Sequence, residues 1–126
     1  MEVLIDTQSF IWFFEDNPRL PTPVRLFVEK RVNLVSIASF WEITIKTSLG
    51  KLTVPEGISG LIDKALSKGF KILPIEREHL IVLLTLEFIH RDPFDRIIIS
   101  QAIAENMPLV SSDNVFKHYP VNLIWE

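Results

Sequence analysis

Val3-Leu4-Ile5-Asp6-Thr7, near the start of the chain, is the stretch of sequence that decides the fold. Three consecutive aliphatic residues with no polar alternation are typical of a strand that is buried on both faces of a sheet. The apolar run ends at an acid, and residues 7–15 then show helical spacing of their aromatic side chains. A buried strand that leads directly into a helix predicts an α/β protein whose strands run parallel.

The rest of the chain continues this alternation of short apolar runs and longer amphipathic segments. Further strands are expected at residues 32–36, 70–73, 109–110 and 122–125. Further helices are expected at residues 22–30, from the second strand to about residue 49, 55–68 (as one helix or two), 76–89 and 92–106, with a helical turn near 114–119. We therefore expect one domain over residues 1–126, a three-layer α/β/α sandwich around a mostly parallel sheet of about five strands. In such a sheet, ligands bind at the carboxyl ends of the strands.

Local signals predict several helix ends and the burial of one helix. Thr22-Pro23 is typical of a helix start with Thr as the capping residue, and Asp92-Pro93 is a second start of this kind. Gly50 suits the left-handed position that follows a helix. The segment 76–89 is strongly apolar, which predicts a buried helix.

The composition excludes several classes of protein. The chain has 126 residues, of which 48% are hydrophobic and 23% charged, and this ordinary globular mix excludes a disordered chain. It contains no cysteine, so disulfides, zinc–thiolate sites and cysteine nucleophiles are excluded. The net charge of −3 argues against a protein that binds polyanions through bulk positive charge. No segment resembles a membrane span or a signal peptide, so we expect a cytoplasmic protein without membrane contact.

Four acids are expected at the carboxyl edge of the sheet. Asp6 and Asp113 follow the first and fourth strands, whereas Glu42 and Asp95 lie in helices that begin on the same edge. Each has a structural alternative, because Asp6 and Asp113 could cap helices and Asp95 could favour a helix dipole. Glu42 could complete a capping box or pair with Lys46, four residues later. The four acids therefore support a functional interpretation only as a group.

Two of these acids border apolar helix faces, where a lone carboxylate is costly unless it has partners. Glu42 lies three residues before Ile45, and Asp95 lies three residues before Ile98. Four carboxylates at close range repel one another, and the hard cations Mg²⁺ and Mn²⁺ relieve this because they prefer oxygen ligands. Such a site can hold one ion or two, and two ions suit phosphodiester hydrolysis.

The same acids belong to four motifs that follow one another in a characteristic order. The motifs are Leu4-Ile5-Asp6-Thr7, Ser39-Phe40-Trp41-Glu42-Ile43, Arg91-Asp92-Pro93-Phe94-Asp95-Arg96-Ile97-Ile98 and Leu109-Val110-Ser111-Ser112-Asp113. In this order they resemble the PIN-domain nucleases, and most closely the toxin-type PIN proteins of VapBC toxin–antitoxin pairs. The resemblance covers essentially the whole chain. It implies four metal-binding catalytic acids and two hydroxyl residues that support the metal shell, namely Asp6, Glu42, Asp95 and Asp113, with Thr7 and Ser112.

The resemblance also implies an activity and partners. By it, the protein would be a Mg²⁺- or Mn²⁺-dependent endoribonuclease that cleaves single-stranded RNA and leaves a 3′-hydroxyl and a 5′-phosphate. The implied partners are RNA, a cognate antitoxin protein and a second copy of the chain. The alternative is a non-catalytic PIN-like module that binds RNA or protein, although such a module has no need for four clustered acids. A receiver-type signalling domain is disfavoured, because the strand at 70–73 runs into Pro74-Ile75 with no acceptor Asp.

Basic, histidine and aromatic side chains complete the expectations. Four basic residues flank the acids and either contact RNA phosphates or are ordinary surface charge: Lys46, Lys51, Arg91 and Arg96. The three histidines show no metal-ligand spacing among themselves and are given no catalytic role: His79, His90 and His118. The aromatic residues of the first two helices exceed what one helix face can bury, which indicates either cover by a neighbouring helix or an interface: Phe10, Trp12, Phe13, Phe14 and Phe27.

Overall fold

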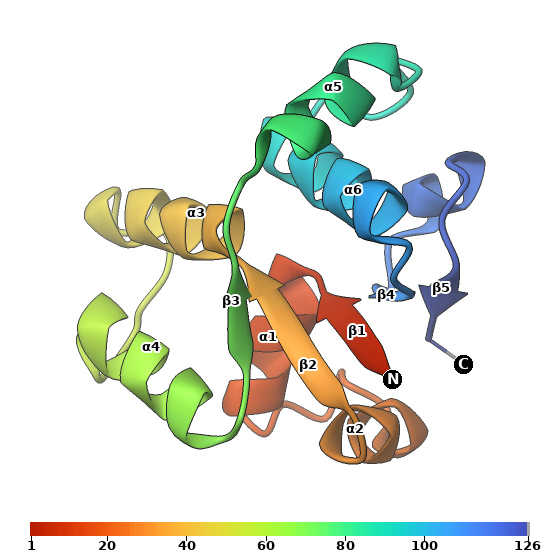
Figure 1. Ribbon diagram of the computed structural model, residues 1–126. Coiled ribbons are helices and arrows are strands. Elements are labelled where there is room, and N and C mark those ends of the chain that lie inside the picture. The colour runs from red at the N-terminus through yellow and green to blue at the C-terminus, as the bar shows by residue number, and fades with distance from the viewer. Residues whose placement is uncertain (126) are drawn as a thin grey trace.

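The computed structural model describes residues 1–125 as alternating strands and helices (Figure 1). The strands are β1 (Glu2–Ile5), β2 (Val32–Ser36), β3 (Lys71–Leu73), β4 (Leu109–Val110) and β5 (Leu123–Ile124). The helices are α1 (Thr7–Phe14), α2 (Thr22–Glu29), α3 (Ile37–Ser48), α4 (Gly57–Ser67), α5 (Arg77–Thr85) and α6 (Pro93–Glu105), and a 3₁₀ helix, η1, spans Asn114–His118. Each predicted element is present. Within residues 1–125, no helix has the length and apolar character needed to cross a bilayer.

The five strands form one sheet in the order β3-β2-β1-β4-β5, and every neighbouring pair is parallel. In the central strand, Leu4 aligns with Leu34 of β2 on one side and with Leu109 of β4 on the other. The chain leaves β1 toward β2 and β3, then returns to the opposite side of β1, so the strand order reverses there. In parallel α/β sheets, the crevice for ligands opens at such a reversal, beyond the carboxyl ends of the strands.

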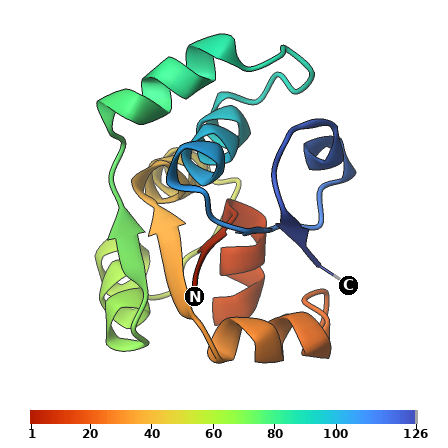
Figure 2. The same ribbon diagram turned by 45° about the vertical axis from the view of Figure 1, so that its right-hand side comes forward.

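Side chains of the sheet alternate between two apolar cores, one on each face. Val3 and Ile5 belong to a core with α1, α2, α3 and α4, whereas Leu4 belongs to a core with α6 and η1. Helix α3 packs against both α1 and α6. Figure 2 shows α5 outside α6, on the far side of that helix from α2. The predicted three-layer sandwich with a parallel sheet is confirmed.

Helix α5 departs from the prediction of a buried helix over residues 76–89. Its apolar side chains Leu80, Ile81 and Leu84 are exposed, and the exposed fraction of Leu84 reaches 88%. Its one fully buried residue is His79. Because α5 packs on α6 rather than on the sheet, it can bury only one stripe of side chains. The prediction of burial was wrong because an apolar sequence does not show which elements lie beside a helix.

Two predicted helix ends are confirmed and one is wrong. The Asp92 side chain accepts backbone hydrogen bonds at the start of α6, and Gly50 has the expected left-handed φ of 71°. Thr22 is not a cap but the first helical residue of α2. The residue before it is Pro21, whose φ is −59° and whose side chain makes no capping hydrogen bond. The chain direction at this helix start is therefore set by the rigid proline ring, and not by a capping Thr hydroxyl.

The aromatic side chains near the start of the chain are covered within the molecule. Phe10 is fully buried, and its ring makes edge contacts with Phe40 and Phe70. Phe13 and Phe14 also pack against Phe70. Cover by neighbouring elements, one of the two predicted alternatives, therefore accounts for Phe10 in full and for Phe13 and Phe14 in part, because these two rings remain partly exposed.

Candidate metal centre

The four predicted acids meet in one open pocket at the carboxyl edge of the sheet. Asp6 follows β1 and Asp113 follows β4, whereas Glu42 lies in α3 and Asp95 in the first turn of α6. All four line a cavity of about 340 Å³, whose other lining residues include Asp92, Lys46, Gln8, Ile11, Thr7 and Ser112. The topology therefore brings together acids from the beginning, the middle and the end of the chain.

Asp6 is buried and serves both the fold and the pocket. Its Oδ1 accepts the backbone N–H of Ser9 at 2.9 Å, which caps α1. Burial raises the pKa of Asp6 and the charge of Asp113 adds to this, whereas the hydrogen bond from Ser9 opposes it. The predicted capping role is confirmed, and it leaves ligand capacity because a carboxylate can accept several bonds.

Glu42 carries a buried carboxylate oxygen that has no hydrogen-bond partner. Its Oε2 pairs with Nζ of Lys46 at 3.0 Å, whereas its Oε1 is buried and unpartnered. A capping-box role is excluded, because α3 begins at Ile37 and is capped by Ser36. An unsatisfied buried acceptor costs roughly 1–3 kcal/mol, and more when it is charged. In a pocket lined by other acids, this oxygen fits a cation ligand.

Asp95 lies at the centre of the negative charge. Burial raises its pKa to about 7, and the charges of Asp92 and Glu42 add to the shift. The imidazole of His90 acts in the opposite direction, with Nε2 at 2.8 Å from Oδ2 of Asp95. The same nitrogen lies 3.6 Å from Oδ2 of Asp113. The carboxyl group of Asp95 is therefore balanced between its neutral and charged forms near neutral pH.

These residues fit a divalent cation. A cation would relieve the repulsion among the acids and give the Oε1 of Glu42 a partner. Donor atoms of His90, Asp95 and Asp113 all lie within 4.8 Å of one another. A site rich in carboxylate oxygens suits Mg²⁺ and Mn²⁺.

The two predicted hydroxyl residues lie at the pocket in different ways. Thr7 is buried, and its Oγ1 donates to Oγ of Ser39 at 2.8 Å, which joins the start of α1 to α3. Ser112 is exposed at the pocket. Its neighbour Ser111 is buried and accepts the backbone N–H of Asp113 at 3.1 Å. Ser111 therefore orients the loop after β4, a role that the sequence analysis did not assign.

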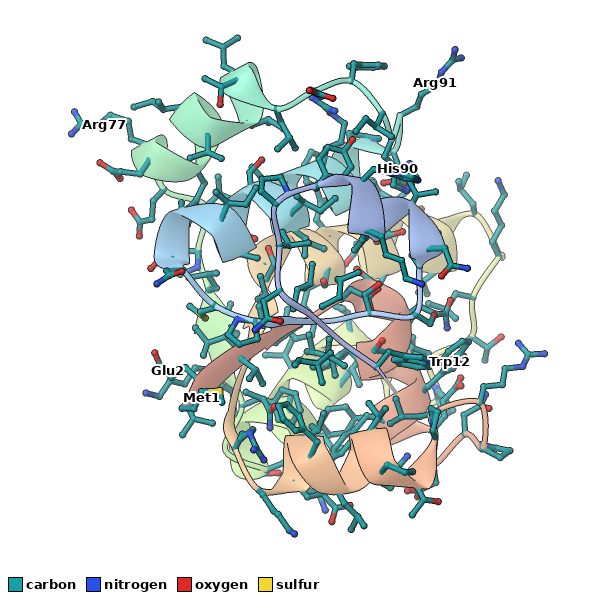
Figure 3. All side chains as sticks on the ribbon, turned by 90° about the vertical axis from the view of Figure 1, so that its right-hand side faces the viewer. Met1, Glu2, Trp12, Arg77, His90 and Arg91 are labelled. Atoms are coloured by element: carbon teal, nitrogen blue, oxygen red, sulfur yellow. The ribbon has the colours of Figure 1, made fainter. Side chains whose placement is uncertain are left out.

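Of the four predicted basic residues, three are exposed and one is buried. Lys46 lines the pocket, Lys51 is exposed beyond the end of α3, and Arg91 points away from the body of the molecule in Figure 3. Arg96 is buried, and its guanidinium donates to the carbonyl oxygen of Glu87 at 2.9 Å. The alternative of an ordinary surface charge is wrong for Arg96, because its position on α6 directs the guanidinium into the protein.

His90 is the residue of this site that sequence reasoning missed. It lies in the loop between α5 and α6, and Figure 3 shows it against the body of the molecule. Histidine spacing could not reveal it, because its partners are acids. The nearest signal in the sequence is the Asp92-Pro93 helix start two residues later, since His90 contacts Asp95 in the first turn of that helix.

Comparison with known proteins gives the family and the fold. The model of the PIN domain family matches residues 3–122. VapBC2 from Rickettsia felis, solved bound to a promoter DNA fragment, is 21% identical over 100% of both chains, with a TM-score of 0.77. DNA-bound VapBC from Salmonella typhimurium is 15% identical over 98% of both chains, with a TM-score of 0.72. A toxin–antitoxin complex from Klebsiella pneumoniae is 18% identical over 97% of this chain and 95% of that one, with a TM-score of 0.67.

The family match and the structural matches differ in what they show about this chain. No curated protein sequence matches this one significantly. The solved structures are distant in sequence and show a shared fold along the whole chain. The family match also spans nearly the whole chain, and it covers all four acids of the pocket. The chain belongs to the PIN domain family.

Proposed function

We propose that this protein is a metal-dependent endoribonuclease and the toxin of a toxin–antitoxin pair. The observation that carries the proposal is the buried, unpartnered Oε1 of Glu42, in a pocket shared with Asp6, Asp95 and Asp113. Membership of the PIN domain family supports nuclease chemistry. The shared fold with proteins of solved toxin–antitoxin complexes supports the toxin role. We also propose a cytoplasmic location, because cellular RNA is made and translated there.

The four acids would hold one or two Mg²⁺ or Mn²⁺ ions, which supply Lewis-acid catalysis and make water nucleophilic near neutral pH. Two of the carboxylates are already oriented by backbone groups. The N–H of Ser9 binds Asp6, and the N–H of Val115 binds Oδ1 of Asp113, both at 2.9 Å. The acids are therefore held in place before any substrate arrives, which lowers the cost of reorganisation during catalysis.

Three exposed basic side chains would hold the RNA backbone. Lys46 lines the pocket itself, and Lys51 and Arg91 are exposed. Each could neutralise one phosphate of a single strand that crosses the opening. Because the chain has a net charge of −3, RNA binding should depend on the metal ions more than on bulk charge.

A non-catalytic PIN-like module that binds RNA or protein is the alternative function. Such a module gains nothing from buried like charges, whereas here burial raises the pKa of both Asp6 and Asp95. Carboxyl groups with raised pKa values in a pocket are typical of catalytic sites. These shifts favour the nuclease.

RNA cleavage by the purified protein tests the nuclease proposal. With Mg²⁺ or Mn²⁺, the wild type should cleave single-stranded RNA, and Asp6→Asn, Glu42→Gln and Asp95→Asn should each lower the rate roughly 100-fold through loss of a metal ligand. Asp63→Asn, which changes an exposed acid on α4, should keep the wild-type rate. Equal residual cleavage by the wild type and all four variants, or cleavage by none, contradicts the proposal.

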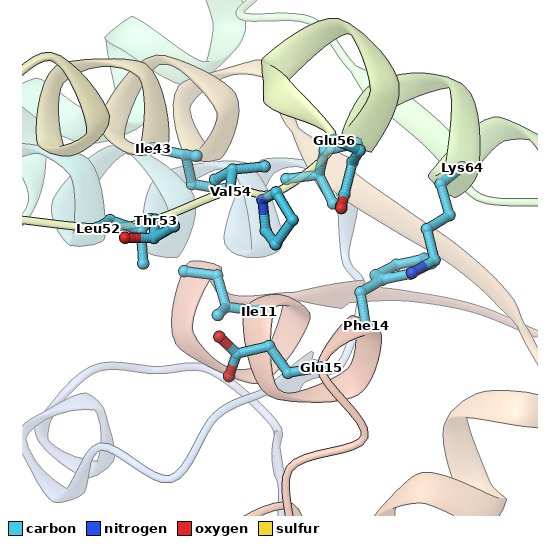
Figure 4. A pocket seen from close by; sticks show the side chains of 11 residues that line it. Ile11, Phe14, Glu15, Ile43, Leu52, Thr53, Val54, Glu56 and Lys64 are labelled. Atoms are coloured by element: carbon cyan, nitrogen blue, oxygen red, sulfur yellow. The ribbon is translucent and has the colours of Figure 1, made fainter.

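An apolar groove beside the carboxylate pocket is where we place the antitoxin (Figure 4). Its walls come from α1, α3, α4 and the segment between α3 and α4, and they include Ile11, Ile43 and Val54. Ile11 also lines the carboxylate pocket, so a peptide segment bound in the groove would lie at the edge of that pocket. A reading frame directly upstream that encodes a DNA-binding antitoxin would supply this partner, and its absence would favour a solitary nuclease.

The exposed apolar face of α5 is where we place a second copy of the chain. Leu80 and Leu84 lie on this face, and the oppositely charged Arg77 and Glu87 lie at its two ends. Antiparallel pairing of two α5 helices would bury the face and bring Arg77 of each copy toward Glu87 of the other. Light scattering should show a dimer for the wild type and for Leu66→Glu on α4, but a monomer for Leu84→Glu. A dimeric Leu84→Glu variant contradicts this placement.

A further inference from the structure

The imidazole of His90 places a nitrogen donor among the carboxylates of the metal centre. Its Nε2 lies 2.8 Å from Oδ2 of Asp95 and 3.6 Å from Oδ2 of Asp113. Donor atoms that bind a six-coordinate ion at about 2.1 Å lie about 3 Å from their neighbours, which is close to these separations. The position of His90 therefore fits a metal ligand as well as a hydrogen-bond partner of Asp95, although His90 comes from a loop and not from the sheet edge.

The loop that carries His90 is held in place by Tyr119. The phenol oxygen of Tyr119 accepts the backbone N–H of His90 at 2.6 Å and that of Ile89 at 3.2 Å. Tyr119 is buried, so water competes little for these bonds. The backbone of His90 is thus fixed by a side chain that does not itself line the carboxylate pocket.

Arg96 also holds this loop in place. Its guanidinium donates to the carbonyl oxygens of Glu87 at 2.9 Å and of His90 at 3.4 Å, and to the hydroxyl oxygen of Tyr119 at 3.4 Å. Within residues 1–125, none of its hydrogen bonds goes to a side-chain carboxylate. A buried guanidinium without a counter-charge is costly unless its donors are hydrogen-bonded. Here the donors bind the loop carbonyls and the hydroxyl of Tyr119, so they fix the loop and the side chain that supports it. The direction of the imidazole therefore does not depend on the bond to Asp95 alone.

A nitrogen ligand changes which cation the centre prefers. Mg²⁺ is held best by oxygen atoms and water, whereas imidazole favours transition-metal ions, of which Mn²⁺ also suits carboxylates. We propose that His90 is a direct ligand of the metal centre and that it makes the centre select Mn²⁺ over Mg²⁺. This rests on the metal-dependent function proposed above and adds one ligand to its four acids. Tyr119 and Arg96 are positioning residues that act through the loop.

Metal binding by the full-length protein tests this ligand directly. Pulsed electron paramagnetic resonance of the Mn²⁺-loaded wild type should show coupling to an imidazole nitrogen. His90→Ala should lose this coupling, and calorimetry should show its preference for Mn²⁺ over Mg²⁺ falling about tenfold, mostly through weaker Mn²⁺ binding. His118→Ala is the matched control, because it removes an exposed histidine outside the cluster and should keep both the coupling and the preference.

A second variant separates metal ligation from hydrogen bonding. The amide of His90→Gln can still donate a hydrogen bond to Asp95 but is a poor ligand, so it should behave like His90→Ala. The proposal is overturned if the wild type shows no nitrogen coupling, if His90→Gln keeps the preference for Mn²⁺, or if His90→Ala weakens Mn²⁺ and Mg²⁺ binding equally.

RNA cleavage distinguishes failure of this proposal from failure of the proposed function. A wild type that cleaves RNA without nitrogen coupling keeps the nuclease function and removes His90 from the metal centre. A wild type with nitrogen coupling but no cleavage keeps His90 as a ligand and removes the nuclease function.

Discussion

Two histidine–carboxylate pairs of nearly equal length lie in this protein, in very different surroundings. His79 lies 2.7 Å from Oε2 of Glu105, and His90 lies 2.8 Å from Oδ2 of Asp95. His79 is fully buried, and its Nδ1 accepts the backbone N–H of Glu76 at 2.9 Å, so both of its nitrogens have partners. The pair with Glu105 joins α5 to α6, and the bond from Glu76 to His79 belongs to the capping box of α5.

The pair at His90 differs in the number of acids around it. Asp92 and Glu42 both raise the pKa of Asp95, and Asp113 lies within 3.6 Å of the same imidazole nitrogen. One imidazole cannot satisfy that many carboxylates, whereas at His79 one imidazole meets one. The geometry of a pair therefore does not reveal its purpose. An excess of charge around the pair indicates a place for a cation.

The largest expected effect comes from breaking the pair at His79. His79→Ala removes a fully buried side chain and the cap of α5, so it should lower the free energy of unfolding by about 3 kcal/mol. Urea denaturation measures this, and His118→Ala should change it by less than about 0.5 kcal/mol. RNA cleavage per folded molecule should stay within about twofold of the wild type. A stable His79→Ala variant with impaired cleavage would show that this pair is not merely structural.

The sequence predicted that four acids would meet at one edge of the sheet. Asp6 and Asp113 follow strands, and all neighbouring strands are parallel, so their meeting at one edge followed from topology alone. Glu42 and Asp95 were predicted from their places on apolar helix faces. These four positions needed no knowledge of loops.

The sequence could not predict features that depend on how loops and outer helices pack. His90 and Arg96 have partners in the segment 86–90 and at Tyr119, and no periodicity reports such contacts. Arg96 was expected to be an RNA contact or a surface charge because it flanks the acids in sequence, yet it is buried under that loop. The burial of α5 was also misjudged, since its packing on α6 is a tertiary property.

At the His90–Asp95 pair, removing the charge should stabilise the protein, whereas breaking the His79 pair should destabilise it. In the metal-free protein, the pKa of Asp95 is raised from 3.8 to about 7 by folding, so the folded state binds its proton more tightly. The stability from this group is complete below pH 3.8 and is lost as the pH rises to about 7. Asp95→Asn cannot ionise, so it should melt several degrees above the wild type near pH 8, and this gain should shrink toward pH 4.

Thermal unfolding in a chelating buffer measures this difference. Glu105→Gln makes the same change in the other pair and should destabilise the protein near pH 8, because it weakens the partner of a fully buried imidazole. If Asp95→Asn and Glu105→Gln both stabilise the protein, or if neither does, the excess of charge around Asp95 does not distinguish the two pairs.

The smallest expected effect comes from loosening the loop between α5 and α6, which orients the His90 imidazole. Tyr119→Phe removes the oxygen that accepts two backbone N–H groups, so it should lower the free energy of unfolding by about 1 kcal/mol. Nitrogen coupling to bound Mn²⁺ should remain but become heterogeneous, and the preference for Mn²⁺ should fall about threefold, less than in His90→Ala. Tyr119 lies outside the carboxylate pocket, so a purely structural residue there would weaken Mn²⁺ and Mg²⁺ binding alike. Equal weakening of Mn²⁺ and Mg²⁺ binding would mean that the loop has no part in metal selection. A loss confined to Mn²⁺ would mean that the Tyr119 hydroxyl orients the His90 imidazole without contacting the metal or the acids.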